Sequence, residues 1–123
     1  MKDTGPDKTK QNKQVNGDEA MTALKQRARA LEDKFAHDQD FMFRARARRN
    51  TLLGLWAAAV LHDKDPQAYA RTVAAADIDD ADGAFARLRR DFDAAGIAVL
   101  DDELRGRMSN MLRDVANEMY DYA

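Results

Sequence analysis

Few residues in this chain belong to the types that carry catalysis, and their spacing does not bring them together. The chain has no cysteine, which excludes disulfides and thiolate metal sites and favours a reducing compartment. The single serine, Ser109, lies within a predicted helix, and His37 and His62 are too far apart on another predicted helix to share a site. A Ser–His nucleophile is therefore not expected. No phosphate loop of the Gly-x-x-x-x-Gly-Lys type is present either, and we predict that the chain is not an enzyme.

An acidic stretch between two predicted helices is the best candidate for a metal site. When Asp80, Asp82 and Gly83 are set at positions three, five and six of a calcium-binding EF-hand loop, position one falls on Ile78 and position twelve on Arg89. An EF-hand needs carboxylates at both of these positions. We therefore predict no metal site.

Three further features have alternative interpretations. The arginines of the segment 44–49 are suited to nucleic-acid phosphates, or to a solvated face that bridges to the acidic residues later in the chain; the second interpretation is favoured. His37 is a candidate pH switch near neutrality, but an exposed histidine is more often inert. Trp56 marks a ligand pocket or, as is usual on an apolar helix face, a core anchor.

The net charge of −2 in 123 residues argues against a general nucleic-acid binder. The charges are unevenly distributed, with eight basic and four acidic residues in 25–49 and nine acidic and three basic residues in 77–103. This asymmetry either steers docking or acts within the fold. No apolar run approaches the roughly 20 residues that a membrane span needs, and the polar N-terminus does not resemble a secretory signal.

The first part of the chain divides into two segments. Residues 1–20 are polar and cannot bury enough surface to offset their ordering entropy, so we predict a disordered extension. Residues 21–39 form a predicted helical arm with one narrow apolar stripe at helical spacing, made of Leu24, Ala28, Leu31 and Phe35. Such a stripe suits a hydrophobic groove of a partner, or belongs to a surface helix that packs on its own domain.

Residues 40–123 form the predicted body. The first helix should continue to about His62, and Gly54 within it indicates close approach of a neighbouring helix. Asp65 before Pro66 predicts the start of the second helix, Gly96 the end of the third, and Asp101 the N-cap of the fourth. The core face predicted for the first helix comprises Phe41, Ala45, Leu52, Leu55, Trp56, Ala59 and Val60. The fold class is therefore all-α, an antiparallel four-helix bundle with a long first helix and a mobile N-terminal arm.

Several of these residues resemble a known family. The run Lys34-Phe35-Ala36-His37-Asp38, followed by Ala47-Arg48-Arg49-Asn50 and Leu52-Leu53-Gly54-Leu55-Trp56-Ala57-Ala58, resembles the ATP synthase zeta subunit, a small inhibitor of the catalytic head in alphaproteobacteria. The resemblance extends from about Met21 to the C-terminus. It implies a four-helix bundle whose arm inserts at the interface of the alpha and beta subunits, contacts gamma, becomes helical and blocks rotation in the hydrolytic direction.

Carried onto this chain, the resemblance implies that the arm, residues 21–39, binds the partner. The apolar stripe would be buried there, and the basic side chains Arg27, Arg29 and Lys34 would pair with acidic groups. The implied partners are the alpha, beta and gamma subunits, with no nucleic acid and no membrane insertion. The implied location is cytoplasmic, at the inner membrane through ATP synthase, with a monomer in the free state.

Two other functions remain open at this stage. Family members have been associated with adenine nucleotides, so a nucleotide-binding regulatory bundle (ADP or ATP) without strong inhibition is one alternative; no cofactor is otherwise expected. The other alternative is a nucleic-acid-associated protein that acts through Arg44 to Arg49.

Overall fold

The computed structural model describes the backbone of residues 4–121 and the side chains of residues 17–121. It contains four helices, α1 (Thr4–Leu61), α2 (Pro66–Asp79), α3 (Gly83–Ala94) and α4 (Asp101–Asp121), and no strand within the described residues. The all-α prediction is confirmed. The chain separates into two compact units, one up to Asp40 and one from Phe41 onwards, and the second unit is called the body below.

The structure draws the backbone of residues 4–20 as the beginning of α1. Side chains up to residue 16, and the residues 1–3, lie outside the described part of the chain. The predicted disorder of residues 1–20 therefore stays a prediction.

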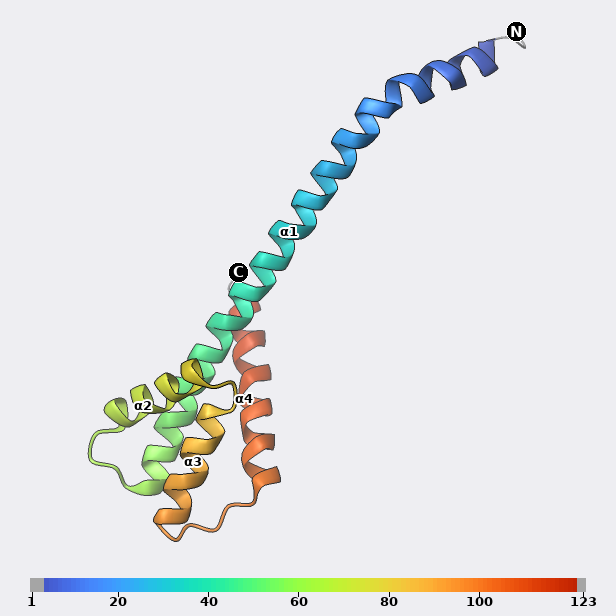
Figure 1. The fold of residues 1–123 in the computed structure, drawn as a ribbon. Coiled ribbons are helices and arrows are strands. Elements are labelled where there is room, and N and C mark those ends of the chain that lie inside the picture. Colours follow the sequence, from blue (N-terminus) through green and yellow to red (C-terminus); the bar gives the residue numbers. More distant parts are fainter. Residues whose placement is uncertain (1–3, 122–123) are drawn as a thin grey trace. The chain divides into compact units, whose positions relative to one another are not determined.

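Contacts between helices show that neighbouring helices of the body run in opposite directions. On α1, Asn50 bonds to Asp77 near the end of α2, while Gly54 lies against Ala70 nearer its start. The helices α2 and α3 contact each other in the same reversed order, through Tyr69–Asp91 and Asp77–Ala84. For α3 and α4 the pairs are Asp82–Arg105 and Arg89–Asp101. For α4 and α1 they are Phe41–Tyr120 and Arg49–Met108 (Figure 1). The predicted antiparallel four-helix bundle is confirmed.

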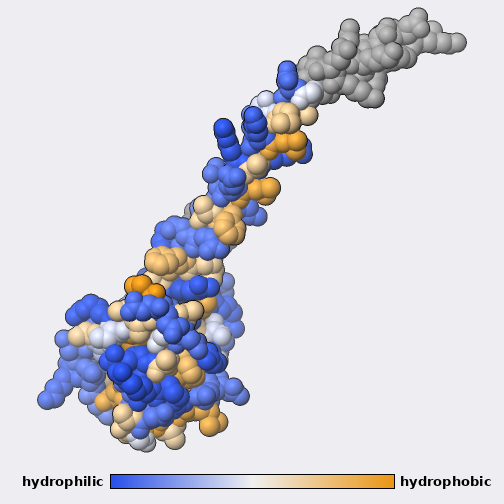
Figure 2. All heavy atoms as spheres, in the orientation of Figure 1, coloured by the Kyte–Doolittle hydropathy of each residue, from blue (hydrophilic) through white to orange (hydrophobic). Residues whose placement is uncertain are grey.

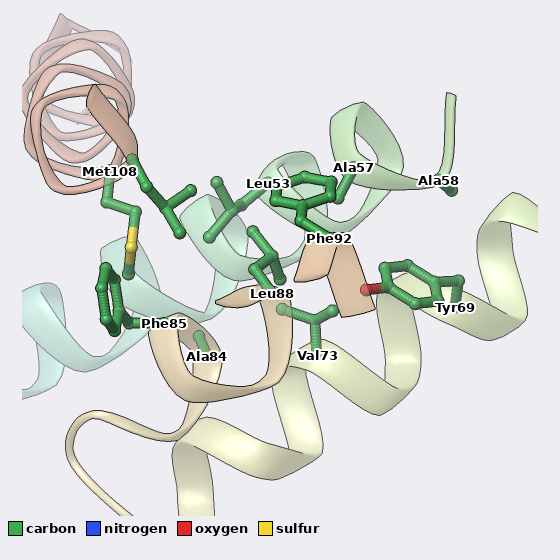
Figure 3. Packing of buried hydrophobic residues seen from close by; sticks show 11 residues of the cluster. Leu53, Ala57, Ala58, Tyr69, Val73, Ala84, Phe85, Leu88, Phe92 and Met108 are labelled. Atoms are coloured by element: carbon green, nitrogen blue, oxygen red, sulfur yellow. The ribbon is translucent and has the colours of Figure 1, made fainter. Parts of the chain in front are cut away.

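All four helices contribute to one hydrophobic core. Its largest fully buried side chains are Leu53 of α1, Val73 of α2, Leu88 and Phe92 of α3, and Leu104 of α4. Figure 3 shows Leu53, Leu88, Phe92 and Val73 converging from three helices. Burial of this apolar surface holds the body together.

The face that α1 turns to the core agrees with the predicted one only in part. Ala45 is buried, and Trp56 and Val60 pack against the core, as predicted. Leu53, Ala57 and Ala58 are buried, whereas Leu52 and Ala59 are exposed. Nearly every residue from 52 to 61 is apolar, so hydrophobic periodicity alone does not fix which side faces inward. The small residues Gly54, Ala57 and Ala58 lie on the inward face, where they allow another helix to approach closely.

Local signals set most of the helix ends. The Asp65 side chain accepts a hydrogen bond of 3.1 Å from the Ala68 amide at the start of α2, as predicted. Gly96 has a φ of 70° and follows α3, where the Ile97 amide bonds back to the Phe92 carbonyl at 2.9 Å. The prediction that Asp101 is the N-cap of the fourth helix was wrong.

Asp101 is the first residue of α4 instead of its cap. Its carboxylate accepts a hydrogen bond of 3.0 Å from Arg89 of α3. Asp101 therefore joins α3 to α4 and also places negative charge in the first turn of α4.

A buried tyrosine and two charged residues join α2 to α3. The Tyr69 hydroxyl donates to Asp91 at 2.6 Å, and Arg87 donates to the same carboxylate oxygen at 2.8 Å. Burial disfavours the charge of Asp91, but the two hydrogen bonds outweigh it and hold the pKa of that carboxyl below its usual range. Burial and the bond to Asp91 raise the pKa of Tyr69, so the hydroxyl remains a donor.

Replacing Gly54 with alanine should destabilise the body. A Cβ at this position would lie 2.5 Å from the Ala70 Cα, so α1 and α2 would have to separate. We expect a loss of about 1–3 kcal/mol in the free energy of unfolding, measured by urea denaturation.

Gly106 is the matched control, since a Cβ there meets nothing within 4 Å. Gly106→Ala should stabilise α4 by roughly 0.5–1 kcal/mol. If both variants moved in the same direction, the close contact at Gly54 would not be the cause of the effect.

The Asp91 carboxylate should contribute stability that depends on pH. Because its pKa is lower in the folded state than its ordinary value of 3.8, the contribution is complete above that value and is lost as the pH falls through the folded pKa. Asp91→Asn should lower the free energy of unfolding by about 1–3 kcal/mol at neutral pH. The difference from the wild type should shrink as the pH approaches about 2.

Asp33→Asn provides the comparison, since Asp33 is exposed and forms no ion pair within the described residues. It should change stability by less than about 0.5 kcal/mol at every pH. An Asp91→Asn deficit that is the same at acidic and neutral pH would contradict the role of the charge.

Candidate functional site

The predicted arm, residues 21–39, presents its apolar stripe to solvent. Leu24, Leu31 and Phe35 are 57%, 67% and 66% exposed, and Ala28 between them is exposed as well. Figure 2 shows hydrophobic residues recurring among polar ones along this helical segment. Contiguous exposed apolar side chains often mark a surface that binds another protein, whereas single exposed apolar residues are common on any surface.

Met21 belongs to the same stripe, although the sequence analysis did not include it. It precedes Leu24 by three residues and is 56% exposed. The helical spacing of three and four residues was the available signal. The stripe thus has five members, Met21, Leu24, Ala28, Leu31 and Phe35, and is called the arm stripe below.

The three predicted basic contacts do not share one face of the helix. Successive residues of an α-helix are about 100° apart. This rotation places Arg27 and Lys34 along one flank of the arm stripe, about 80° and 100° from its centre, and places Arg29 on the other flank, about 120° from its centre. Arg27 and Lys34 are therefore the pair that could contact the same wall of a groove that covers the stripe.

These basic side chains make no ion pair or hydrogen bond among the described residues. The ion pair recorded within 21–39 joins His37 and Asp38 at 3.9 Å, and both side chains are largely exposed. The charges of Arg27 and Lys34 are thus available for external carboxylates. His37 lies in water, and its role as a pH switch stays untested.

The predicted phosphate-binding segment 44–49 is partly structural. Arg49 is buried, donating 2.7 Å from its Nε to Asn50 and 3.4 Å from its Nη1 to the Met108 carbonyl. Asn50 donates in turn to Asp77 at 2.8 Å. Burial lowers the pKa of Arg49, and nearby Asp77 opposes this shift.

This polar network joins α1 to α2 and α4, and sequence reasoning did not find it. It makes Arg49 unavailable to nucleic acid. Arg48 lies 3.8 Å from Glu118 of α4, so part of the arginine segment pairs within the body. The nucleic-acid alternative therefore loses support.

Trp56 packs on the core, as one of the two interpretations made from the sequence expected, while its role in a ligand pocket stays a prediction. Its ring meets Phe92 edge-on at 5.6 Å within the core, and Arg107 lies 4.2 Å from its centroid on the outer side. The ring also lines a surface pocket of about 560 Å³. Three carboxylates line the same pocket, those of Asp102, Glu103 and Asp114, and they disfavour a phosphate ligand.

The described part of the chain has neither a candidate metal site nor a helix suited to cross a membrane. No group of three or more histidine, cysteine, aspartate or glutamate side chains there could hold a metal ion. None of the helices in that part combines the length and the apolar composition that a bilayer crossing requires.

An exposed apolar stripe on a charged helix is the form in which one class of protein, the helix-in-groove binders, recognises a partner. Comparison with protein families agrees with a role in partner binding. The family model for ATPase inhibitor subunit zeta matches residues 21–118, which comprise most of the chain. A comparison of the chain with curated proteins found no match. The chain belongs to the ATPase inhibitor subunit zeta family, and the predicted resemblance is confirmed.

Proposed function

We propose that this protein inhibits ATP hydrolysis by F-type ATP synthase by inserting its arm, residues 21–39, between the alpha, beta and gamma subunits. The family supports inhibition of an ATPase. The observation that carries the insertion step is the arm stripe, which is exposed and flanked by Arg27 and Lys34. These features suit a groove with apolar walls and carboxylates along one side.

Hydrophobic burial would provide most of the binding free energy. The exposed surfaces of Leu24, Leu31 and Phe35 are removed from water in the complex, and each large side chain contributes up to about 1.5–3 kcal/mol. Association and ordering of side chains oppose this gain. Affinity therefore depends on how closely the groove matches the spacing of the stripe.

Charge pairing would fix the register of the arm. Arg27 and Lys34 are seven residues apart, which corresponds to about 10 Å along an α-helix. Two carboxylates at that spacing on one wall of the groove would hold the arm in a single position. Such pairs give specificity and faster association more than raw affinity.

A helix held between alpha, beta and gamma blocks rotation in one direction. In our proposal, hydrolytic rotation presses the bound arm further into the interface, while rotation in the direction of synthesis ejects it. The protein would thereby act at the cytoplasmic face of the inner membrane, through ATP synthase, and would be monomeric when free.

Replacing two members of the arm stripe with glutamate should abolish tight inhibition. Leu31→Glu/Phe35→Glu buries two charges where apolar side chains are needed, and we expect the half-inhibitory concentration for ATP hydrolysis to rise about 100-fold or more. The measurement is a titration of the isolated catalytic head, with each variant also checked for helicity.

The control is Gln26→Glu/Ala30→Glu, which adds two carboxylates at the same spacing on the roughly opposite face. It should inhibit like the wild type. Equal loss of inhibition in both variants would point to net charge or helix stability, and unchanged inhibition in the stripe variant would rule out insertion of this face.

A further inference from the structure

The body has a second exposed apolar surface, separate from the arm. Phe43 of α1 and Ile78 of α2 are 65% and 77% exposed, and both line one surface pocket of about 200 Å³. Ala47 and Ala74 lie between them in the lining. This surface, called the Phe43–Ile78 pocket below, has room for an apolar side chain.

The polar side chains of this pocket are Asn50 and Asp77, which are hydrogen-bonded within the body, and Arg46, for which the described residues provide no partner. Asn50 donates to one Asp77 oxygen at 2.8 Å, and the other oxygen accepts from the Ala84 amide at 3.4 Å. Arg46 lines the same pocket and forms no ion pair or hydrogen bond among the described residues. The pocket thus offers apolar walls, the Arg46 cation without an ion-pair partner in the described part of the chain, and the Asp77 carboxylate, which is hydrogen-bonded within the body.

The core does not require these two side chains. Neither Phe43 nor Ile78 belongs to the buried cluster or to the residues packed against it. Single exposed apolar residues are normal on a protein surface. Two large ones from different helices in one pocket, beside an unpaired arginine, indicate a ligand with an apolar side chain next to a carboxylate.

We propose that the Phe43–Ile78 pocket is a second docking surface for the catalytic head of ATP synthase. It would accept an apolar side chain from the surface of the head, with Arg46 pairing with an adjacent carboxylate. This inference rests on the proposed function of the arm. It assigns the body a part in binding, in addition to carrying the arm.

Chain connectivity favours the head as the occupant. Phe43 follows Phe35 by eight residues, and a chain of that length spans at most about 30 Å in any conformation. A head that holds the arm therefore has surface within reach of the pocket. Covalent linkage gives the second contact a high effective concentration, so a surface of two side chains is sufficient.

Two other occupants agree less well with the pocket. A second copy of the chain is disfavoured because this small pocket is far below the area of a stable dimer interface. An extended anionic membrane surface would face all three aspartates around Ile78, which are Asp77, Asp79 and Asp80, whereas a single carboxylate beside Arg46 would not.

The two surfaces then have different roles. The arm blocks rotation, and the Phe43–Ile78 pocket increases affinity without contributing to the block. Loss of the pocket should shift the concentration needed for inhibition and leave the maximum inhibition unchanged. Loss of the arm stripe should remove inhibition even at saturation.

The test uses the full chain with Phe43→Ser/Ile78→Ser, titrated against ATP hydrolysis by the isolated catalytic head. We expect the half-inhibitory concentration to rise about tenfold or more, with unchanged maximum inhibition. Arg46→Glu should also weaken inhibition, more strongly at low salt. Leu100→Ser is the matched control, because Leu100 is 69% exposed on the α3–α4 connection, and it should inhibit like the wild type.

Thermal unfolding should be unchanged in all of these variants, since every replaced side chain is exposed. If the wild type inhibits and the pocket variant matches it, the second docking surface is excluded and the proposed function stands. If the wild type neither binds nor inhibits, the proposed function itself fails. A wild-type dimer that dissociates in the pocket variant, measured by sedimentation, would overturn the inference in favour of a second copy.

Discussion

The body buries α1 over only part of its length, and the rest of the structure depends on this limit. From Ala45 to Ala58 the helix has α2, α3 and α4 to pack against, and its small residues let α2 approach until Gly54 touches Ala70. Between residues 24 and 40 every described side chain is exposed. Apolar residues in that range are exposed and do not stabilise the bundle, and the proposed binding of a partner would account for their regular spacing. In our proposal one helix serves both the core and an interaction surface.

The part of α1 that lies in the body also contains a buried charged side chain, that of Arg49. Arg49 is buried where α1, α2 and α4 meet, and its hydrogen bonds reach Asn50 and the Met108 carbonyl. No buried side-chain nitrogen or oxygen lacks a partner in the described part of the chain. A satisfied polar network of this kind costs little and specifies how the helices align, because a shifted register would leave Arg49 unpaired. Arg49 and Asn50, which belong to the motif on which the predicted family resemblance was based, thus help to maintain the body.

Much of the fold was predictable because its signals are local. Asp65–Pro66 and Gly96 mark helix ends through backbone chemistry, and Gly54 marks a close helix contact. Three features were not predictable in the same way. The predicted inward face of α1 was right for Ala45, Trp56 and Val60 and wrong for Leu52 and Ala59, because apolar residues occur on every side of the helix there. Asp101 is the first residue of α4 and pairs with Arg89, and the burial of Arg49 depends on partners distant in sequence. The arm stripe was visible in the sequence, but its partner and its role in inhibition stay predictions, since a periodic pattern does not identify what covers it.

Hydrogen exchange of the full-length protein, free and bound to the isolated catalytic head, tests the central claim most directly. The backbone amides of residues 21–39 should exchange quickly in the free protein, because no other helix buries that segment. On binding they should become protected to the same extent as the core amides of α3. Binding that protects only amides of the body, while residues 21–39 exchange as fast as in the free protein, would contradict the account.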